Sequence, residues 1–270
     1  MRIRPMLRSD LGSVADVGVQ VFHNDNLFRF IYPGLDEHSE DFRRSYLLRL
    51  RERFATPGSY SILAETEEGD QEWSGKTEIA GYAFWERDGG DGLWVGGNDW
   101  PESLLNQLEL SLLHLESEFE HRLFNRAIDL EHKRTVWRCM DFSFDHVLQD
   151  SPYIHLAVLA VSPSCQRRGI GAKLIRWGLE RAQRELRGGV PVTLESSPKG
   201  YGLYRKMGFV QVARIPIEGL PKADDAIAMV WEPEGKKGRW IKAGEEEAQK
   251  GTDISDGEAA KATETTAEIA

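Results

Sequence analysis

The chain has 270 residues, and its 34 basic and 44 acidic side chains give a formal net charge of −10. With 40% hydrophobic and 10% aromatic residues it has the composition of a globular protein, which excludes a largely disordered chain. The acidic balance argues against a general nucleic-acid binder or a protein held on anionic membranes, because both need a basic surface.

The first third of the chain predicts strands and helices in turn. Asp10 is a suitable N-cap for the apolar positions that follow it at helical spacing. An aromatic-rich stretch comes next and is ended by Pro33 and Gly34. The predicted strands of this part are residues 3–6, 60–65 and 79–85, and a second helix is predicted over residues 39–54.

The segment from about 87 to 150 has a different character, since Leu108, Leu112, Leu115 and Phe119 recur at helical spacing beside a polar face. This spacing predicts a helical insertion, read as a hairpin packed on the body of the protein. A lid or an oligomer seam is the functional alternative for the same segment.

Residues 153–161 are nearly continuous in apolar side chains except for His155, which is typical of a strand covered on both faces. A helix and a further strand follow directly, and such a β-turn-α-β unit joins two parallel strands. The elements predicted after this strand are a helix at 172–186, a strand at 190–194, a helix at 200–207 and strands at 209–217 and 226–231.

The apolar pattern stops near residue 234. We therefore expect a single domain over residues 1–234 and a disordered acidic tail over residues 235–270. Eight acidic residues and three lysines between positions 241 and 270 carry half of the net charge, so the charge of the whole chain says little about its ligand.

The turn that follows residues 153–161 predicts a site for phosphate or pyrophosphate. Gly169 and Gly171 let a ligand approach the backbone, and Arg167 and Arg168 add positive charge. The first amides of the following helix have no intrahelical partner, and the helix dipole adds a partial positive charge there.

Two other glycine-rich motifs fail on spacing. A Walker A loop needs lysine where Ala172 stands, and the dinucleotide fingerprint needs glycine where Leu174 stands. Residues 166–171 instead resemble the Q/R-x-x-G-x-G/A signature of the GNAT superfamily of acetyl-CoA-dependent N-acetyltransferases. Residues 204–209 resemble the Y-x-x-x-G-F ending of the same family, and the strong resemblance covers residues 153–212.

The resemblance implies an α/β fold (α+β by some schemes) with a mixed central sheet, helices on both faces and a V-shaped splay between the fourth and fifth strands. The helical insertion would lie between strands three and four. Acetyl-CoA would lie in the splay, with its pantetheine on the backbone of Leu159 and Val161 and its pyrophosphate on the amides of residues 167–172. The cofactor-binding residues implied are Leu159, Ala160, Val161, Gln166, Arg167, Arg168, Gly169, Ile170, Gly171, Ala172, Ser197 and Tyr204.

Two residues are candidates for proton transfer. The resemblance implies that Tyr204 protonates the departing thiolate. His155 stands where some members of the family carry glutamate, and a histidine with a pKa of about 6.5 can accept a proton at neutral pH. Core packing is the alternative for both. Ser197 stands where many members have asparagine, and could bind pantetheine or cap a helix.

The expected reaction is transfer of an acetyl group from acetyl-CoA to a primary amine by direct attack, with a small molecule favoured over a peptide as the acceptor. The alternatives are a non-catalytic CoA-binding regulatory module and a protein lysine or N-terminal acetyltransferase. Four aromatic residues are candidates for the acceptor pocket, with core packing as the alternative for each: Phe22, Phe28, Tyr32 and Trp85.

Neither a metal nor a nucleic-acid or membrane partner is expected. No cluster of His, Cys and Asp has metal-ligand spacing. The first residues lack the apolar core of a signal peptide, no window approaches the roughly 18 apolar residues of a transmembrane helix, and there are only two cysteines, Cys139 and Cys165. We therefore expect no nucleic-acid partner, no membrane partner and a cytoplasmic location, with the nucleus left open. The oligomeric state stays open, a homodimer included.

Overall fold

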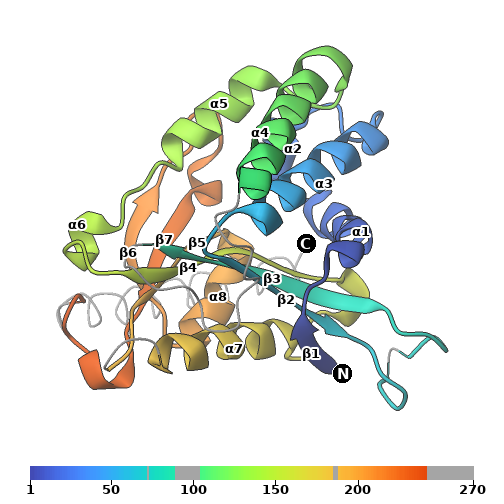
Figure 1. Cartoon of the computed structure of the whole chain (residues 1–270). Coiled ribbons are helices and arrows are strands. Elements are labelled where there is room, and N and C mark those ends of the chain that lie inside the picture. Colours follow the sequence, from blue (N-terminus) through green and yellow to red (C-terminus); the bar gives the residue numbers. More distant parts are fainter. Residues whose placement is uncertain (72, 89–103, 185–187, 242–270) are drawn as a thin grey trace, which may run out of the picture.

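The computed structural model describes residues 1–71, 73–88, 104–184 and 188–241, and a sheet in the strand order β1-β2-β3-β4-β5-β7-β6 lies at its centre. Figure 1 shows α1 to α5 above this sheet and α7 and α8 below it, which confirms the predicted mixed sheet with helices on both faces. The strands are β1 (Arg2–Pro5), β2 (Ser59–Glu65), β3 (Ile79–Asp88), β4 (Tyr153–Val161), β5 (Val192–Ser196), β6 (Val210–Ile215) and β7 (Ala226–Trp231). The helices are α1 (Leu11–Phe22), α2 (Asn26–Ile31), α3 (Ser39–Ala55), α4 (Leu104–Phe119), α5 (Leu130–Cys139), α6 (Asp145–Leu148), α7 (Ile170–Arg184) and α8 (Pro198–Lys206).

Strands β4 and β5 are parallel neighbours over only two residue pairs. Ile154 pairs with Val192, and His155 pairs with Thr193. Beyond this point β4 continues beside β3 as far as Val161, whereas β5 continues beside β7. The predicted splay between the fourth and fifth strands is therefore confirmed, and it begins directly after His155 and Thr193.

Each face of the sheet has its own hydrophobic core. Below the sheet, α7 buries Leu174 and Ile175 in a cluster that includes Trp85 of β3. Above the sheet, α1 and α3 bury Val14 and Tyr46 together with strand residues of β2 and β3. Because α1, α3 and α7 carry apolar side chains on the face toward the sheet, each of these three helices buries that face, and one fully buried leucine contributes about 1.5–3 kcal/mol.

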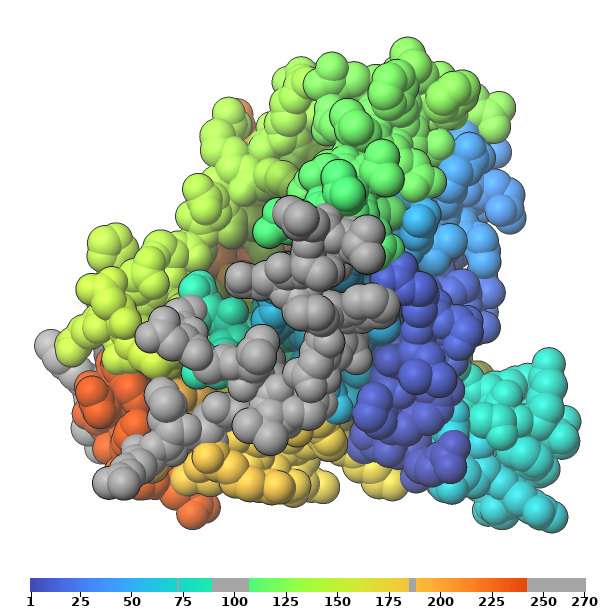
Figure 2. Space-filling model, in the orientation of Figure 1, coloured from blue at the N-terminus to red at the C-terminus, as the bar shows by residue number. Residues whose placement is uncertain are grey.

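The described part of the insertion between β3 and β4 is helical, as predicted. Helix α4 packs on α3 through Leu113, which is buried with Leu48 and Ala55. The buried carboxylate of Asp41 on α3 accepts hydrogen bonds from the backbone N–H and the Nε of Arg126, and so fixes the turn between α4 and α5. Figure 2 shows these insertion helices, in green, forming the upper part of the molecule beside the blue N-terminal elements.

The apolar stripe of α4 points away from the body. It comprises Leu108, Leu112, Leu115 and Phe119, which are 57–65% exposed. The sequence spacing thus identified the helix, but the neighbouring face, with Leu113, makes the contact with α3. The predicted insertion residues 89–103 lie outside the described residues.

Several element boundaries differ from the predicted ones. Helix α2 falls in the aromatic-rich stretch to which no element was assigned, and Asp25 caps it by accepting hydrogen bonds from the amides of Leu27 and Phe28. Asp10 does not cap α1, because its carboxylate bonds to the amide of Leu7 and to Arg4. Strand β5 begins at Val192 rather than at residue 190, since the residue at 190 closes α7 by donating to the Ala182 carbonyl.

The packed part of the chain extends beyond the predicted boundary at residue 234. Trp240 and Ile241 are buried, and their backbone amides donate to the carboxylate of Glu232 at 2.6 and 3.1 Å. The start of the tail at residue 235 is therefore wrong, because this carboxylate satisfies the amides of the segment that follows it. The rest of the predicted tail, residues 242–270, lies outside the described residues.

Replacing Gly178 of α7 by alanine should destabilise the fold by about 1–3 kcal/mol, because overpacking forces buried groups to move. A Cβ at this position would lie 2.2 Å from Cζ2 of Trp85, a residue with no exposed surface. Gly202→Ala in α8 is the matched control, since a Cβ there meets nothing within 4 Å. Thermal unfolding should show a lower midpoint for Gly178→Ala alone, and equal midpoints for the two variants would contradict this packing.

Candidate active site

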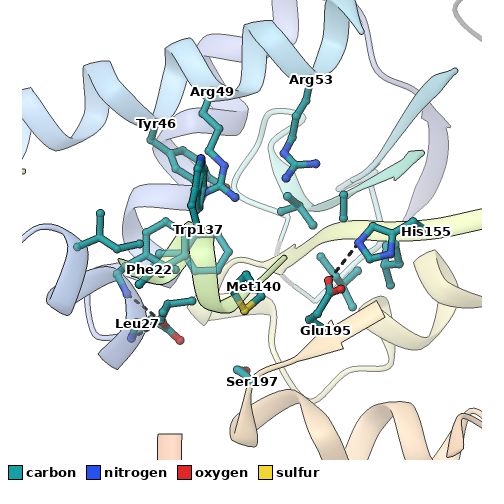
Figure 3. Close-up of a pocket in the computed structure, with 18 of the residues that line it drawn as sticks. Phe22, Leu27, Tyr46, Arg49, Arg53, Trp137, Met140, His155, Glu195 and Ser197 are labelled. Carbon is teal, nitrogen blue, oxygen red and sulfur yellow. Dashed lines mark hydrogen bonds and ion pairs between the residues drawn. The ribbon is translucent and has the colours of Figure 1, made fainter. Parts of the chain in front are cut away.

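A cavity of about 720 Å³ opens where β4 and β5 separate. Helices α1, α2, α3 and α5 form its upper walls, and β4 forms part of its floor. Figure 3 shows Arg49 and Arg53 reaching from α3 toward the cavity, with His155 and Glu195 on the strands opposite. The splay of the sheet and the insertion therefore enclose one space between them.

His155 and Glu195 form a polar pair at the fork of the two strands. The Nε2 atom of His155 lies 3.2 Å from Oε2 of Glu195, and Nδ1 lies 2.9 Å from Oγ1 of Thr193. Because an ionised carboxylate can only accept, neutral His155 carries its proton on Nε2, and Nδ1 accepts from the hydroxyl of Thr193. Both ring nitrogens of His155 then have hydrogen-bond partners, whereas the carboxylate of Glu195 still has lone pairs that face the cavity.

Glu195 was not anticipated from the sequence. It lies two residues beyond Thr193 on β5 and so shares the face of the sheet to which His155 points. The pairing of His155 with Thr193 would have indicated this, but that register cannot be read from the residues alone.

Tyr204 reaches the cavity from the opposite side of the sheet. It belongs to α8, packs against Phe209 in the lower core, and lines the cavity above. Burial raises the pKa of the Tyr204 phenol above its ordinary value of 10.0. The side chain is therefore a protonated hydroxyl throughout the neutral range.

A β-bulge in β4 lies at the floor of the cavity. Phe84 pairs with Val158 and Trp85 pairs with Leu156, which leaves Ala157 as an extra residue that lines the cavity. The bulge changes which residues face each side, so His155 before it and Val158 after it share the upper face.

The backbone of β4 beyond the bulge faces the gap between the strands. The amide of Ser162 donates to the Ala80 carbonyl and therefore points toward β3. Because the backbone N–H and C=O groups of successive residues in a strand point in opposite directions, those of Leu159 and Val161 point away from β3. The side-chain amide of Gln166 donates to the Val161 carbonyl at 3.1 Å, which is consistent with that direction. This open edge includes the predicted pantetheine positions.

The loop between β4 and α7 is exposed over residues 166–169. Arg167 and Gly169 have φ angles of 60° and 78°, both in the left-handed region. The amide of Lys173 makes the first intrahelical bond, to the Gly169 carbonyl at 3.0 Å, so the amides of residues 170–172 have no partner within the helix. Ile170 and Gly171 are buried in the first turn, and an added Cβ on Gly169 would meet nothing within 4 Å.

The structure also gives the positions of Ser197 and of the four aromatic candidates for the acceptor pocket. Ser197 caps α8 by accepting from the Gly200 amide at 3.3 Å, and it also lines the cavity. Phe22 and Phe28 line the cavity, whereas Tyr32 lines a second cavity of about 270 Å³. The prediction of a pocket role for Trp85 is wrong, because its side chain faces α7 below the sheet.

Comparisons with known proteins agree with this geometry. Residues 142–218 match the family model described as the acetyltransferase (GNAT) domain. The chain contains a GNAT acetyltransferase domain. The matched stretch includes β4, the loop, α7, β5 and α8, and thus the residues around the splay.

Two similar proteins extend the comparison over most of the chain. A protein of Stachybotrys chartarum named acetyltransferase is 26% identical over 218 residues, which is 78% of this chain and 81% of that protein. The crystal structure of the histone acetyltransferase HPA2 and related acetyltransferase from Corynebacterium glutamicum superposes with a TM-score of 0.54 and 22% identity. The superposition covers 86% of this chain and 95% of the other, and it shows that the two share a fold. The named relative thus agrees with the GNAT match of residues 142–218, and the solved structure agrees with the fold.

Two further observations concern ligands. Among the described residues, no group of three or more His, Cys, Asp or Glu side chains is arranged to hold a metal ion. In the same part of the chain, each helix is too short or too polar to cross a lipid bilayer.

Proposed function

We propose that this protein transfers the acetyl group of acetyl-CoA to a primary amine of a small molecule by direct attack. The observation that carries the proposal is the cavity at the β4–β5 splay, which brings an acid–base pair and a protonated phenol to one space. The test is acetyl-dependent release of the CoA thiol over a panel of amines, with mass spectrometry of the acetylated product.

The first requirement of the reaction is a neutral amine. An alkyl ammonium with a pKa near 10 is mostly protonated at neutral pH, so a base is needed before attack. Glu195 takes this proton, directly or through one water, because its carboxylate has lone pairs left and lines the cavity. His155 holds Glu195 in place through Nε2 and is itself fixed by Thr193. His155 thus supports the base rather than accepting the proton first.

The second requirement is a proton for the leaving group. The amine nitrogen bonds to the thioester carbon, the carbon–sulfur bond breaks, and the thiolate takes its proton from Tyr204. The acetylated nitrogen then loses one further proton through water, which restores the Tyr204 phenol, and Glu195 releases the first proton to solvent. The raised pKa of Tyr204 keeps that proton in place until the thiolate forms. Backbone N–H groups at the bulge, around Ala157, are suited to stabilise the developing oxyanion.

The third requirement is a bound donor. The open edge at Leu159 and Val161 offers backbone partners for the amide-containing arm of acetyl-CoA. The amides at the start of α7 and the open space at Gly169 suit its pyrophosphate. Arg167 in the same loop adds a positive charge.

Two alternatives receive less support. A regulatory module that only binds CoA would not require the Glu195–His155 pair or a buried phenol at the splay. A protein lysine or N-terminus as acceptor would suit a broad groove, whereas the cavity is walled by Phe22, Phe28 and the insertion residue Trp137. Peptide amines belong in the same panel, and preference for them would overturn the small-molecule assignment.

Gly169→Val should weaken acetyl-CoA binding by at least about tenfold, because the added side chain strains a residue at φ 78° and fills the space above the amides. Gly238→Val is the matched control, with a φ of 77° and equally open space outside the loop. Isothermal titration calorimetry measures both. Unchanged affinity in Gly169→Val would remove the pyrophosphate assignment.

Glu195→Gln should lower kcat/KM by about 10²–10⁴-fold, the usual contribution of a general base. His155→Gln should cost less, about tenfold, since the carboxylate remains but loses its support. Steady-state kinetics of both variants at one neutral pH measure these losses. A larger loss in His155→Gln than in Glu195→Gln would instead identify His155 as the base.

Tyr204→Phe should lower kcat by about 10²-fold or more while acetyl-CoA affinity changes little, because the ring remains and only the proton donor is lost. The pKa of Tyr204 lies above 10.0, so the phenol stays protonated and should produce no fall in rate below that pH. Steady-state kinetics across pH test this with two substrates, acetyl-CoA and an acetyl thioester whose leaving thiol is more acidic. That thioester should restore much of the rate in Tyr204→Phe, and equal losses with both thioesters would contradict the acid role.

A further inference from the structure

Arg49 of α3 is a cation in the cavity wall without a carboxylate partner among the described residues. It lines both the main cavity and the second cavity, and its guanidinium lies over the ring of Trp137 at 4.8 Å from the centroid. Stacking uses the flat face of a guanidinium and leaves the N–H groups at its edge available for an anion.

The other two arginines and two of the carboxylates that line the main cavity are paired within the chain, whereas the exposed carboxylate of Asp141 also lines it. Arg53 pairs with Glu86, and Arg138 pairs with Glu218 at 2.8 Å. On the acidic side, Asp25 caps α2 and Glu195 pairs with His155. Arg49 differs from both other arginines in lacking such a partner.

The surroundings of Arg49 disfavour its charge. Burial, and then the nearby charge of Arg53, lower the pKa of Arg49. Glu52, one turn further along α3, lines the second cavity, and burial raises the pKa of its carboxyl, which weakens it as a counter-charge. A buried cation is costly unless an anion meets it. The chain therefore keeps a cation that a ligand could neutralise.

We propose that the amine acceptor also carries a carboxylate, which binds the free edge of Arg49. This inference rests on the proposed function and names the substrate class of the same site. The two ends of such a molecule meet opposite charges, because its amine faces Glu195 on β5 and its carboxylate faces Arg49 on α3 (Figure 3).

The side chains near Arg49 also indicate the chemistry of the rest of the acceptor, the part between its amine and its carboxylate. Phe22 and Phe28 stack with ring centroids 4.4 Å apart, and Leu27 and Met140 line the same cavity. Apolar walls favour an apolar or aromatic body. The substrate class is thus an amino-acid-like zwitterion with an apolar or aromatic body.

The test compares matched amines that differ in one carboxylate. Phenylalanine is compared with phenethylamine, para-aminomethylbenzoate with benzylamine, and aminohexanoate with hexylamine, which varies the spacing of the two charges. In at least one pair, the wild-type enzyme should have a kcat/KM at least about tenfold higher for the carboxylate, the usual effect of a charge-assisted hydrogen bond.

Arg49→Met keeps the apolar stem on Trp137 and removes the charge, so the preference within that pair should fall by about 10- to 100-fold, through KM. Arg49→Lys should recover part of the preference. Arg43→Gln is the matched control, because Arg43 lies on the same helix but pairs with Asp16 outside the cavity. This variant should keep the wild-type preference.

Equal turnover of both members of every pair by the wild type would overturn the inference while leaving amine acetylation intact. An equal loss for both members in Arg49→Met would also overturn it, since a merely structural role predicts that result. Failure to acetylate any amine would contradict the proposed function instead. In that case calorimetric binding of phenylpropionate to the CoA-loaded protein decides the inference: binding lost in Arg49→Met supports it, and no binding to the wild type overturns it.

Discussion

The short parallel pairing between β4 and β5 is the constraint on which the site depends. Two residue pairs hold these strands together, and their last members are His155 and Thr193. If pairing continued, the polar edge of β4 at Leu159 and Val161 would be filled by β5 and no ligand could use it. The separation instead leaves that edge open, and the antiparallel pairings of β4 with β3 and of β5 with β7 carry the stability of the two strands.

The same separation explains why the proposed acid and base come from opposite faces of the sheet. A continuous sheet would isolate the lower core from the upper cavity. At the gap, Tyr204 of the lower core and Glu195 of the upper face line one space. Their surroundings also differ, since Tyr204 is buried among apolar rings while Glu195 is held by His155. Different surroundings are what an enzyme needs to keep one group protonated and another ready to accept a proton.

The sequence predicted the parts of this structure that depend on local pattern. The apolar run of β4, the turn with Gly169 and the amphipathic α7 are short-range signals, and each lies where it was expected. What could not be predicted depends on register and on contacts distant in sequence. Glu195 becomes meaningful only when β5 is paired with β4, and the outward stripe of α4 shows that periodicity identifies a helix but not its partner. The segment around Trp240 is held by the carboxylate of Glu232 and, much further away in the sequence, by the hydroxyl of Ser151, and composition reveals neither contact.

Arg49 shows how the insertion shapes the acceptor end of the cavity. Arg49 is half-buried beside buried residues of α3, and partial burial of an unpaired charge there opposes folding. The insertion supplies Trp137, whose ring accepts the guanidinium face and so makes the burial tolerable without neutralising the charge. A carboxylate of the chain would satisfy Arg49 fully but would also block it. The incomplete compensation by an aromatic ring therefore leaves room for the charge of a substrate, and it ties the choice of acceptor to a segment outside the matched family region.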